Sequence, residues 1–151
     1  TATYANDEVF YLFYGKSYNP NSDQNKKYIK MRGRKVYEFA LKNVPAAIKE
    51  CIDKSKSNIS EIKKILIHQA NAKMDDAIVK RLYKLYNLEA PENIMPLTVD
   101  RFGNSSVATV PTMYDLILNE NLDNHQIKKG DKIIFASVGA GMHINAMVYE
   151  H

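Results

Sequence analysis

The sequence contains little cysteine, few glycines and prolines, and no long apolar run. One cysteine among 151 residues excludes a disulfide framework and a thiolate metal cluster within the chain. Six glycines and five prolines, none of them clustered, exclude a disordered or collagen-like class. No apolar run approaches the roughly 20 residues that span a bilayer, so we expect a soluble, cytoplasmic protein with no membrane segment. Residues 1–5 lack the basic and apolar regions of a secretory signal and do not begin with Met, which is compatible with processing or with a longer parent protein.

What the chain does contain is enough for one ordinary globular domain. Its length predicts burial of roughly 70% of the surface that the unfolded chain exposes, so no covalent staple is needed. The formal net charge is +4. A charge of this size affects solubility and the encounter with acidic partners, and by itself does not distinguish nucleic acid from an acidic protein.

The first third of the chain divides into a strand, a loop and a helix. The apolar and aromatic run at residues 9–14, closed by Gly15, predicts a buried strand rather than a base-stacking surface, which argues against a nucleic-acid partner. Residues 16–30 are polar and predict a loop. From Arg34 onward, apolar residues at spacings of three and four predict a helix that Pro45 should break or kink near residues 42–44. The apolar positions are Val36, Ala40, Val44, Ala47, Ile48, Cys51 and Ile52.

The middle of the chain alternates between strand and helix patterns. A capped turn at residues 58–62 precedes an apolar run at 65–67 that suits a central parallel strand. Asn71 is the predicted N-cap of the next helix, in which Asp75 and Asp76 would complement the positive helix end. Residues 95–99 predict a strand or extended piece, and residues 100–106 a loop. The two helices that flank these segments should bury Ile78, Val79, Leu82 and Leu85, and then Val107, Val110, Tyr114, Ile117 and Leu118.

The last twenty residues predict an antiparallel hairpin at a sheet edge. Residues 132–138 form an apolar strand, residues 139–141 turn the chain, and residues 142–149 alternate in polarity. Because strands alternate with helices along the whole chain, we expect one α/β domain over residues 1–151, with α-β-α layers and a mixed sheet that ends in this hairpin.

Two strand-end positions attract chemical interest. His68 lies where a buried strand leads into a helix, and Asn104 lies in a glycine-bearing loop before another helix. Ligands of open α/β folds bind where such loops converge. Two neutral N–H donors aimed at one point would form an oxyanion hole for a carbonyl oxygen that gains charge. The alternative on spacing alone is a buried histidine with satisfied hydrogen bonds and an ordinary turn asparagine.

Four short segments resemble one known family. They are His68-Gln69-Ala70-Asn71, the stretch from Thr98 to Ser106, the turn Gly139-Ala140-Gly141, and the helix-opening segment from Met31 to Ala40. Their order and spacing closely resemble the C-terminal half of beta-ketoacyl-acyl-carrier-protein synthase III. The resemblance implies a thiolase-like fold, in which two similar halves each present a sheet with helices on both sides.

The resemblance also implies an activity and assigns roles to residues. The family condenses an acyl primer from acyl-CoA with malonyl-acyl carrier protein by a decarboxylating Claisen reaction, usually to start fatty-acid synthesis. Its histidine corresponds to His68 and its asparagine to Asn104. Its nucleophilic cysteine belongs to the N-terminal half, whereas the cysteine here, Cys51, lies on the apolar face of a predicted helix beside acidic residues, as a small core residue would. The 151-residue chain alone is therefore predicted to be inactive.

Further residues follow from the same resemblance. Asn71 would lie near the pantetheine arm, although its N-cap role explains it equally well, and Lys73 would meet the carrier protein unless it is simply a solvated lysine. Val138 and the turn Gly139-Ala140-Gly141 would pack their backbone against the condensing site. The implied partners are acyl carrier protein and acyl-CoA or malonyl thioesters, with a homodimer as the full-length protein. No cofactor and no metal are expected, since His125 and His143 are far apart in sequence and belong to no carboxylate cluster.

Two alternatives remain open at the level of sequence. One is a related thiolase-fold synthase of secondary metabolism, and the other is a non-catalytic interaction domain that retains the family's sequence. Residues 142–146 and Ser105-Ser106-Val107 depart from the family's usual pattern. These departures leave the acyl specificity open.

Overall fold

The structure is a computed structural model that describes residues 10–122 and 124–151. Its strands are β1 (Leu12–Lys16), β2 (Lys27–Met31), β3 (Ile62–Ile67), β4 (Lys132–Gly139) and β5 (His143–Glu150). Its α-helices are α1 (Gly33–Lys54), α2 (Ala72–Lys84), α3 (Val99–Phe102) and α4 (Thr109–Leu118), and its short 3₁₀ turns are η2 (Ile59–Glu61), η3 (Ser106–Ala108) and η4 (Ala140–Met142).

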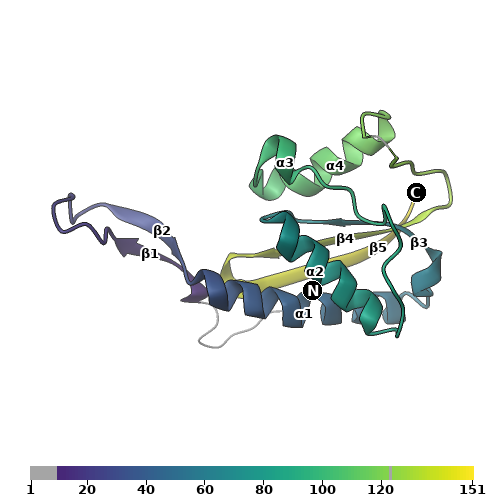
Figure 1. Cartoon of the computed structure of the whole chain (residues 1–151), viewed down its shortest axis with the longest axis horizontal. Helices are drawn as coiled ribbons and strands as arrows, with labels where there is room; N and C mark the ends of the chain where they lie inside the picture. Colours follow the sequence, from purple (N-terminus) through teal and green to yellow (C-terminus); the bar gives the residue numbers. More distant parts are fainter. Residues whose placement is uncertain (1–9, 123) are drawn as a thin grey trace.

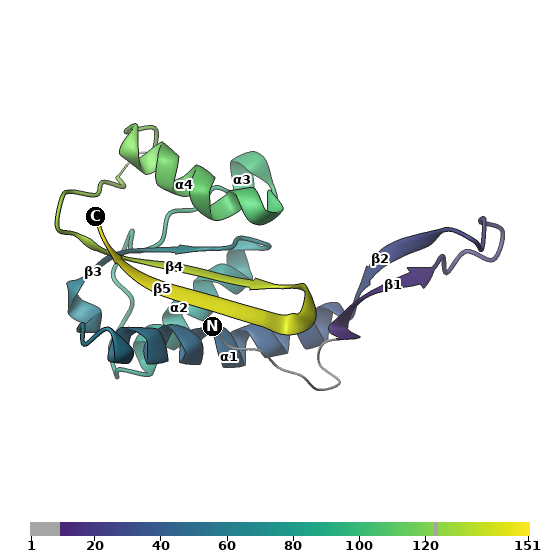
Figure 2. The ribbon, with the colours of Figure 1, turned by 180° about the vertical axis from the view of Figure 1, so that it is seen from behind.

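A mixed three-stranded sheet forms the centre of the molecule. Strand order is β3-β4-β5; β3 pairs in parallel with β4, and β4 pairs antiparallel with β5. Helices α1 and α2 lie on one side of this sheet and α4 lies on the other (Figure 1). The view from behind shows the same three layers (Figure 2). The predicted α-β-α architecture and the C-terminal antiparallel hairpin are therefore confirmed.

The core follows the alternation of side chains along β3 and β4. Ile65 and Ile134 belong to the larger apolar cluster with α1 and α2, whereas Leu66 and Ile133 contact the smaller cluster beneath α4. Because successive strand residues point to opposite faces, each strand must be apolar on both faces to serve both layers. This is why the run at residues 65–67 has no polar side chain.

Truncating the core should be costly. Ile134 is fully buried between β3 and β5, so Ile134→Ala should lower the free energy of unfolding by about 2–5 kcal/mol, measured by chemical denaturation. Leu85→Ala removes a similar volume from a side chain that is 47% exposed and should cost much less. Equal losses in the two variants would contradict this description of the core.

The N-terminal segment differs from the prediction of a buried strand and a loop. Strands β1 and β2 form an antiparallel hairpin that projects away from the rest of the molecule (Figures 1 and 2). Tyr14 is 71% exposed, and Ile29 on β2 is also exposed. Part of the predicted strand, Val9, lies outside the described residues. Apolar runs are usually buried, but here only Tyr11 and Leu12 pack, half-buried, against the larger core cluster, while the rest of the hairpin extends beyond it.

Helix α1 continues through Pro45, which excludes the break that the sequence predicted as the alternative to a kink. A proline removes one backbone hydrogen bond inside a helix. Here Pro45 is buried within a helix of 22 residues whose apolar stripe, including Val44 and Ile48, packs against the sheet layer. Packing on both sides of the proline outweighs the lost hydrogen bond, since tertiary contacts supply most helical stability. No helix among the described residues is long and apolar enough to cross a membrane.

Smaller differences concern the ends of helices and of the sheet. The buried stripe of α2 includes the predicted Ile78, Val79 and Leu82, but Leu85 lies at the exposed C-cap. Around α4, Ile117 is buried as predicted, whereas Val107 and Leu118 are exposed. Residues 95–99 form no strand, although the Ile65 amide donates to the Ile94 carbonyl next to them (2.9 Å). The run at residues 65–67 was predicted as a central strand, but within the described residues β4 rather than β3 is the middle strand.

Candidate active site

The candidate site begins where β3 ends. The His68 backbone N–H donates to the Ala136 carbonyl of β4 at 2.9 Å, which extends the parallel pairing by one residue beyond the strand. The histidine is thereby held by the sheet on one side and by the turn into α2 on the other. Because β3 and β4 run parallel, the segments that follow both strands meet at this edge.

Asn104 reaches the same edge from the loop after α3. Gly103 has φ 63° and ψ −160°, a backbone conformation that only glycine adopts readily, and it turns the chain out of the helix. The Asn104 side-chain oxygen Oδ1 then accepts the Ser106 backbone N–H at 2.9 Å. This bond fixes the orientation of the amide and leaves its Nδ2 group as the part that can donate to a ligand.

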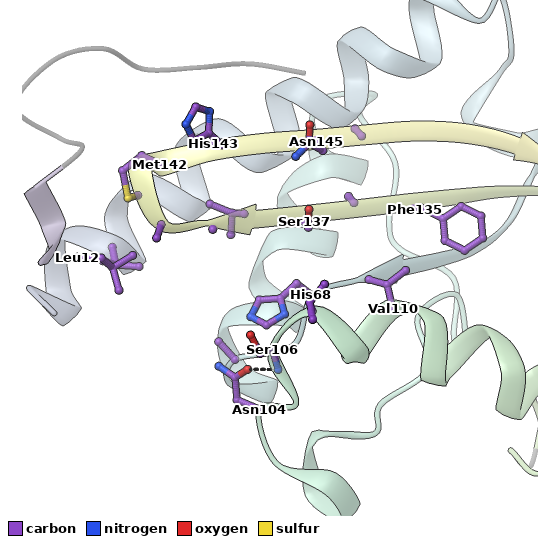
Figure 3. A pocket seen from close by; sticks show the side chains of 18 of the residues that line it. Leu12, His68, Asn104, Ser106, Val110, Phe135, Ser137, Met142, His143 and Asn145 are labelled. Carbon is purple, nitrogen blue, oxygen red and sulfur yellow. Dashed lines mark hydrogen bonds between the residues drawn. The ribbon is translucent and has the colours of Figure 1, made fainter. Parts of the chain in front are cut away.

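The two side chains line one cavity of about 950 Å³. Figure 3 shows the His68 ring and the Asn104 side chain at the same part of the cavity, with Ser106 between them. The predicted Val138, Gly139 and Ala140 also line this cavity. Asn71, Lys73 and Gly141 are not part of its lining; Asn71 and Lys73 are exposed at the start of α2. Sequence reasoning missed several apolar lining residues, among them Val110, Phe135 and Met142.

Burial lowers the pKa of His68 below its ordinary value of 6.5. A hydrogen bond with the Ser106 backbone acts in the opposite direction, since an acceptor beside a ring nitrogen favours the protonated form. Burial is the larger effect, so the imidazole is neutral near pH 7. Ser106 itself has a φ of 55°, which is uncommon for a residue other than glycine and was not foreseen from the sequence.

The start of α2 combines a confirmed cap with an unexpected buried acid. The Asn71 side chain accepts the backbone N–H groups of Lys73 and Met74, as an N-cap should. Asp75, which the sequence predicts to complement the positive end of this helix, is fully buried, and neither carboxyl oxygen has a hydrogen-bond partner among the described residues. Burial raises its pKa to about 7, against a weaker effect of the nearby Asn71 and Ala70 backbone that favours the ionised form.

The turn between β4 and β5 closes one end of the cavity. Gly141 has φ 75°, and a Cβ atom there would lie 2.9 Å from the His143 ring, so a side chain at this position would collide with the ring. The turn brings Met142, which is fully buried, and His143 into the cavity lining. Of the glycines predicted to pack their backbone near the site, Gly141 thus has a steric reason to lack a side chain.

Among the described residues, neither a cysteine nor a metal-binding cluster accompanies His68 and Asn104 at the cavity. Cys51 is partly buried on α1 and is not part of the cavity lining. Its intermediate burial places it at the margin of the core rather than fully within it. Within residues 10–122 and 124–151, no group of three or more His, Cys, Asp or Glu side chains could hold a metal ion.

Comparison with known proteins identifies relatives named beta-ketoacyl-[acyl-carrier-protein] synthase III. The chain is 32% identical over 130 residues to beta-ketoacyl-[acyl-carrier-protein] synthase III 2 of Lactiplantibacillus plantarum, a match that covers 86% of this chain and 37% of that protein. It is 34% identical over 118 residues to the beta-ketoacyl-[acyl-carrier-protein] synthase III of Clostridium perfringens, covering 78% of this chain and 33% of that protein.

A solved structure agrees with these relatives. The beta-ketoacyl-[acyl carrier protein] synthase III of Thermus thermophilus matches with a TM-score of 0.76 and 28% identity, over 95% of this chain and 42% of that one. The chain therefore spans well under half the length of the relatives it matches. The family described as 3-oxoacyl-[acyl-carrier-protein (ACP)] synthase III C terminal matches residues 52–151, two thirds of the sequence. The chain belongs to the family of the 3-oxoacyl-[acyl-carrier-protein] synthase III C-terminal domain.

Proposed function

We propose that this chain is the C-terminal part of a condensing acyltransferase that joins an acyl primer from acyl-CoA to malonyl-acyl carrier protein, the step that starts fatty-acid synthesis. The observation that carries the proposal is that His68 and Asn104, which lie 36 residues apart in the sequence, line the same cavity. Two uncharged donors at one cavity suit a reaction in which negative charge develops on a single oxygen.

The proposed reaction needs such a site at its decarboxylation step. The bond between the malonyl carboxylate and the adjacent carbon breaks, carbon dioxide leaves, and the electron pair moves to form an enolate whose oxygen is that of the thioester. His68 and the Nδ2 group of Asn104 would donate hydrogen bonds to this oxygen. The histidine donates only if its N–H faces the substrate, so the thioester oxygen would share or replace the present contact with the Ser106 backbone.

The second half of the reaction needs a nucleophilic cysteine, and no cysteine lines this cavity. The enolate carbon attacks an acyl-cysteine thioester, a carbon–carbon bond forms, and the cysteine thiolate leaves. Cys51 lies outside the cavity lining. We therefore assign the acyl-carrying cysteine to polypeptide other than these 151 residues, which the greater length of the relatives supports.

The proposed partners follow from the same chemistry. Lys73, exposed on the first turn of α2, would meet the acidic carrier protein or its phosphopantetheine phosphate, and Asn71 would lie near the pantetheine arm while it caps the helix. A homodimer of the complete protein is part of this proposal. The departures at residues 142–146 leave straight-chain, branched and aromatic primers as candidates for a substrate profile.

The test compares the complete protein with the isolated chain. Complete protein incubated with a panel of short acyl-CoA primers and malonyl-acyl carrier protein should yield ketoacyl-acyl carrier protein, detected by mass spectrometry. The 151-residue chain alone should yield none, because no cysteine lines its cavity. Steady product from the isolated chain would contradict the assignment of the acyl-carrying cysteine to other polypeptide. Malonyl thioester left intact by the complete protein would favour a non-catalytic interaction domain.

A further inference from the structure

The residue after His68 connects the two parts of the candidate site. Gln69 is fully buried, and its side chain reaches a segment almost 30 residues further along the chain. Its Nε2 group donates to the Pro96 carbonyl at 2.6 Å. Its Oε1 oxygen accepts the backbone N–H groups of Thr98 at 2.8 Å and Val99 at 3.1 Å.

These bonds lie at the start of α3, the helix that leads to Asn104. The first amides of a helix have no partner within the helix, and Thr98 supplies no side-chain cap. The Gln69 oxygen satisfies amides at this position instead. From there only α3 and Gly103 separate the bonded segment from Asn104. Gln69 is therefore joined directly to His68 through the backbone. Through its side chain it is bonded to the start of α3, the short helix that leads to Asn104.

We propose that Gln69 is a positioning residue that sets the separation of His68 and Asn104 by bonding the β3 end to the start of α3. This inference rests on the proposed function for its catalytic consequence, whereas the bonding itself does not depend on it. Glutamine suits the position because an amide donates and accepts at once. A fully buried side chain here must satisfy one carbonyl and two N–H groups, each of which is costly to leave unpaired.

Gln69→Glu in the complete enzyme gives this proposal a distinctive test. Full burial at this position, together with the Pro96 carbonyl facing it, disfavours the charged form of the introduced carboxyl group, so the group is protonated at acid pH. Its O–H can then donate to the Pro96 carbonyl while its other oxygen accepts the two amides. As the pH rises and the group ionises, the donor is lost and an anion faces the carbonyl oxygen. A misplacement in a catalytic site is costly in rate even where the altered residue does not touch the substrate.

The expected result is a pH-dependent ratio of variant to wild-type decarboxylation of malonyl-acyl carrier protein. The ratio of kcat values should approach one at pH 5.5 and fall by about tenfold or more by pH 8.5, with KM within about twofold of wild type. Gln126→Glu, which makes the same charge change at an exposed site, should give a ratio near one throughout. A flat ratio for Gln69→Glu, or a change confined to KM as a carrier-contact residue would give, would overturn the proposal.

A second measurement on the unmodified 151-residue chain covers the case in which the variant does not fold. Hydrogen exchange followed by NMR should show the Thr98 and Val99 amides protected to a degree comparable with amides inside α2. Exchange of both amides as fast as in unbonded loops would exclude the bonding role. If the bonding is present but His68→Ala leaves decarboxylation unchanged in the complete enzyme, the proposed function fails while the contact between Gln69 and the α3 start stands.

Discussion

Replacing His68 with alanine in the complete enzyme should lower the rate of malonyl decarboxylation about 10²–10³-fold, the usual cost of removing one oxyanion donor. The ring is held at the cavity by the sheet, through the bond between its backbone N–H and the Ala136 carbonyl. Burial keeps the pKa of the imidazole below 6.5, so the ring is neutral at pH 7, where its one N–H is the group that can donate to the thioester oxygen.

The matched comparisons for this prediction are Asn104→Ala and Lys80→Ala. The rate of decarboxylation by the asparagine variant should fall by a similar factor, because either donor alone leaves the enolate oxygen with one hydrogen bond instead of two. Lys80 pairs with Asp76 on the exposed side of α2 and should be dispensable for the reaction. If decarboxylation by the His68 and Asn104 variants equals that of the Lys80 variant, the catalytic assignment of the cavity is wrong.

Asp75→Asn should stabilise the 151-residue chain at pH 8 by on the order of 4 kcal/mol while changing it little at pH 4. The pKa of the Asp75 carboxyl is about 7 in the fold, against 3.8 for the unperturbed group. Between these two values the folded chain binds a proton that the unfolded chain does not, so the free energy of unfolding falls as pH rises. Each unit of pKa difference is worth about 1.36 kcal/mol, and the loss is complete above the folded-state pKa.

The measurement is urea denaturation of both proteins from pH 4 to pH 8, and the quantity that matters is the difference between them. Asp76→Asn is the control, because the neighbouring carboxylate is exposed and paired with Lys80 at 2.8 Å. Its stability difference from wild type should stay small and vary little over the same range. If the stability difference between Asp75→Asn and wild type does not grow with pH, the ionised Asp75 carboxylate is not buried away from solvent.

The elements that could be predicted from sequence are those whose residue pattern is compatible with only one local structure. The apolar run of β3 and the cap at Asn71 required no tertiary information, and both are found as expected. Asp75 shows the limit of the helix-end rule. An acid in a first turn is usually a surface residue, but Asp75 precedes Ile78, Val79 and Leu82 by three, four and seven positions and therefore shares their buried face.

The exposed hairpin shows a second limit. An aromatic run predicts burial but does not identify the surface that would bury it, and Tyr14 contradicts the simplest choice. For the site, the positions of His68 and Asn104 left a purely structural explanation open, and only the resemblance of the surrounding segments to the synthase III family singled out the two residues. Gln69 could not be assigned, because its bonds cross 27 to 30 residues and depend on a loop conformation that the sequence does not encode locally.

The order of the sheet has a practical consequence for handling this protein. Strand β5 pairs with β4 on one side, and no described residue forms a strand on its other side. Its outward row of amides and carbonyls is the kind of template that recruits another extended segment, especially with Met147 and Tyr149 exposed along it. Keeping samples dilute should limit aggregation between strands of different molecules. Where crystals or concentrated stocks are wanted, lysine or proline can be introduced at outward positions of β5 for the same purpose.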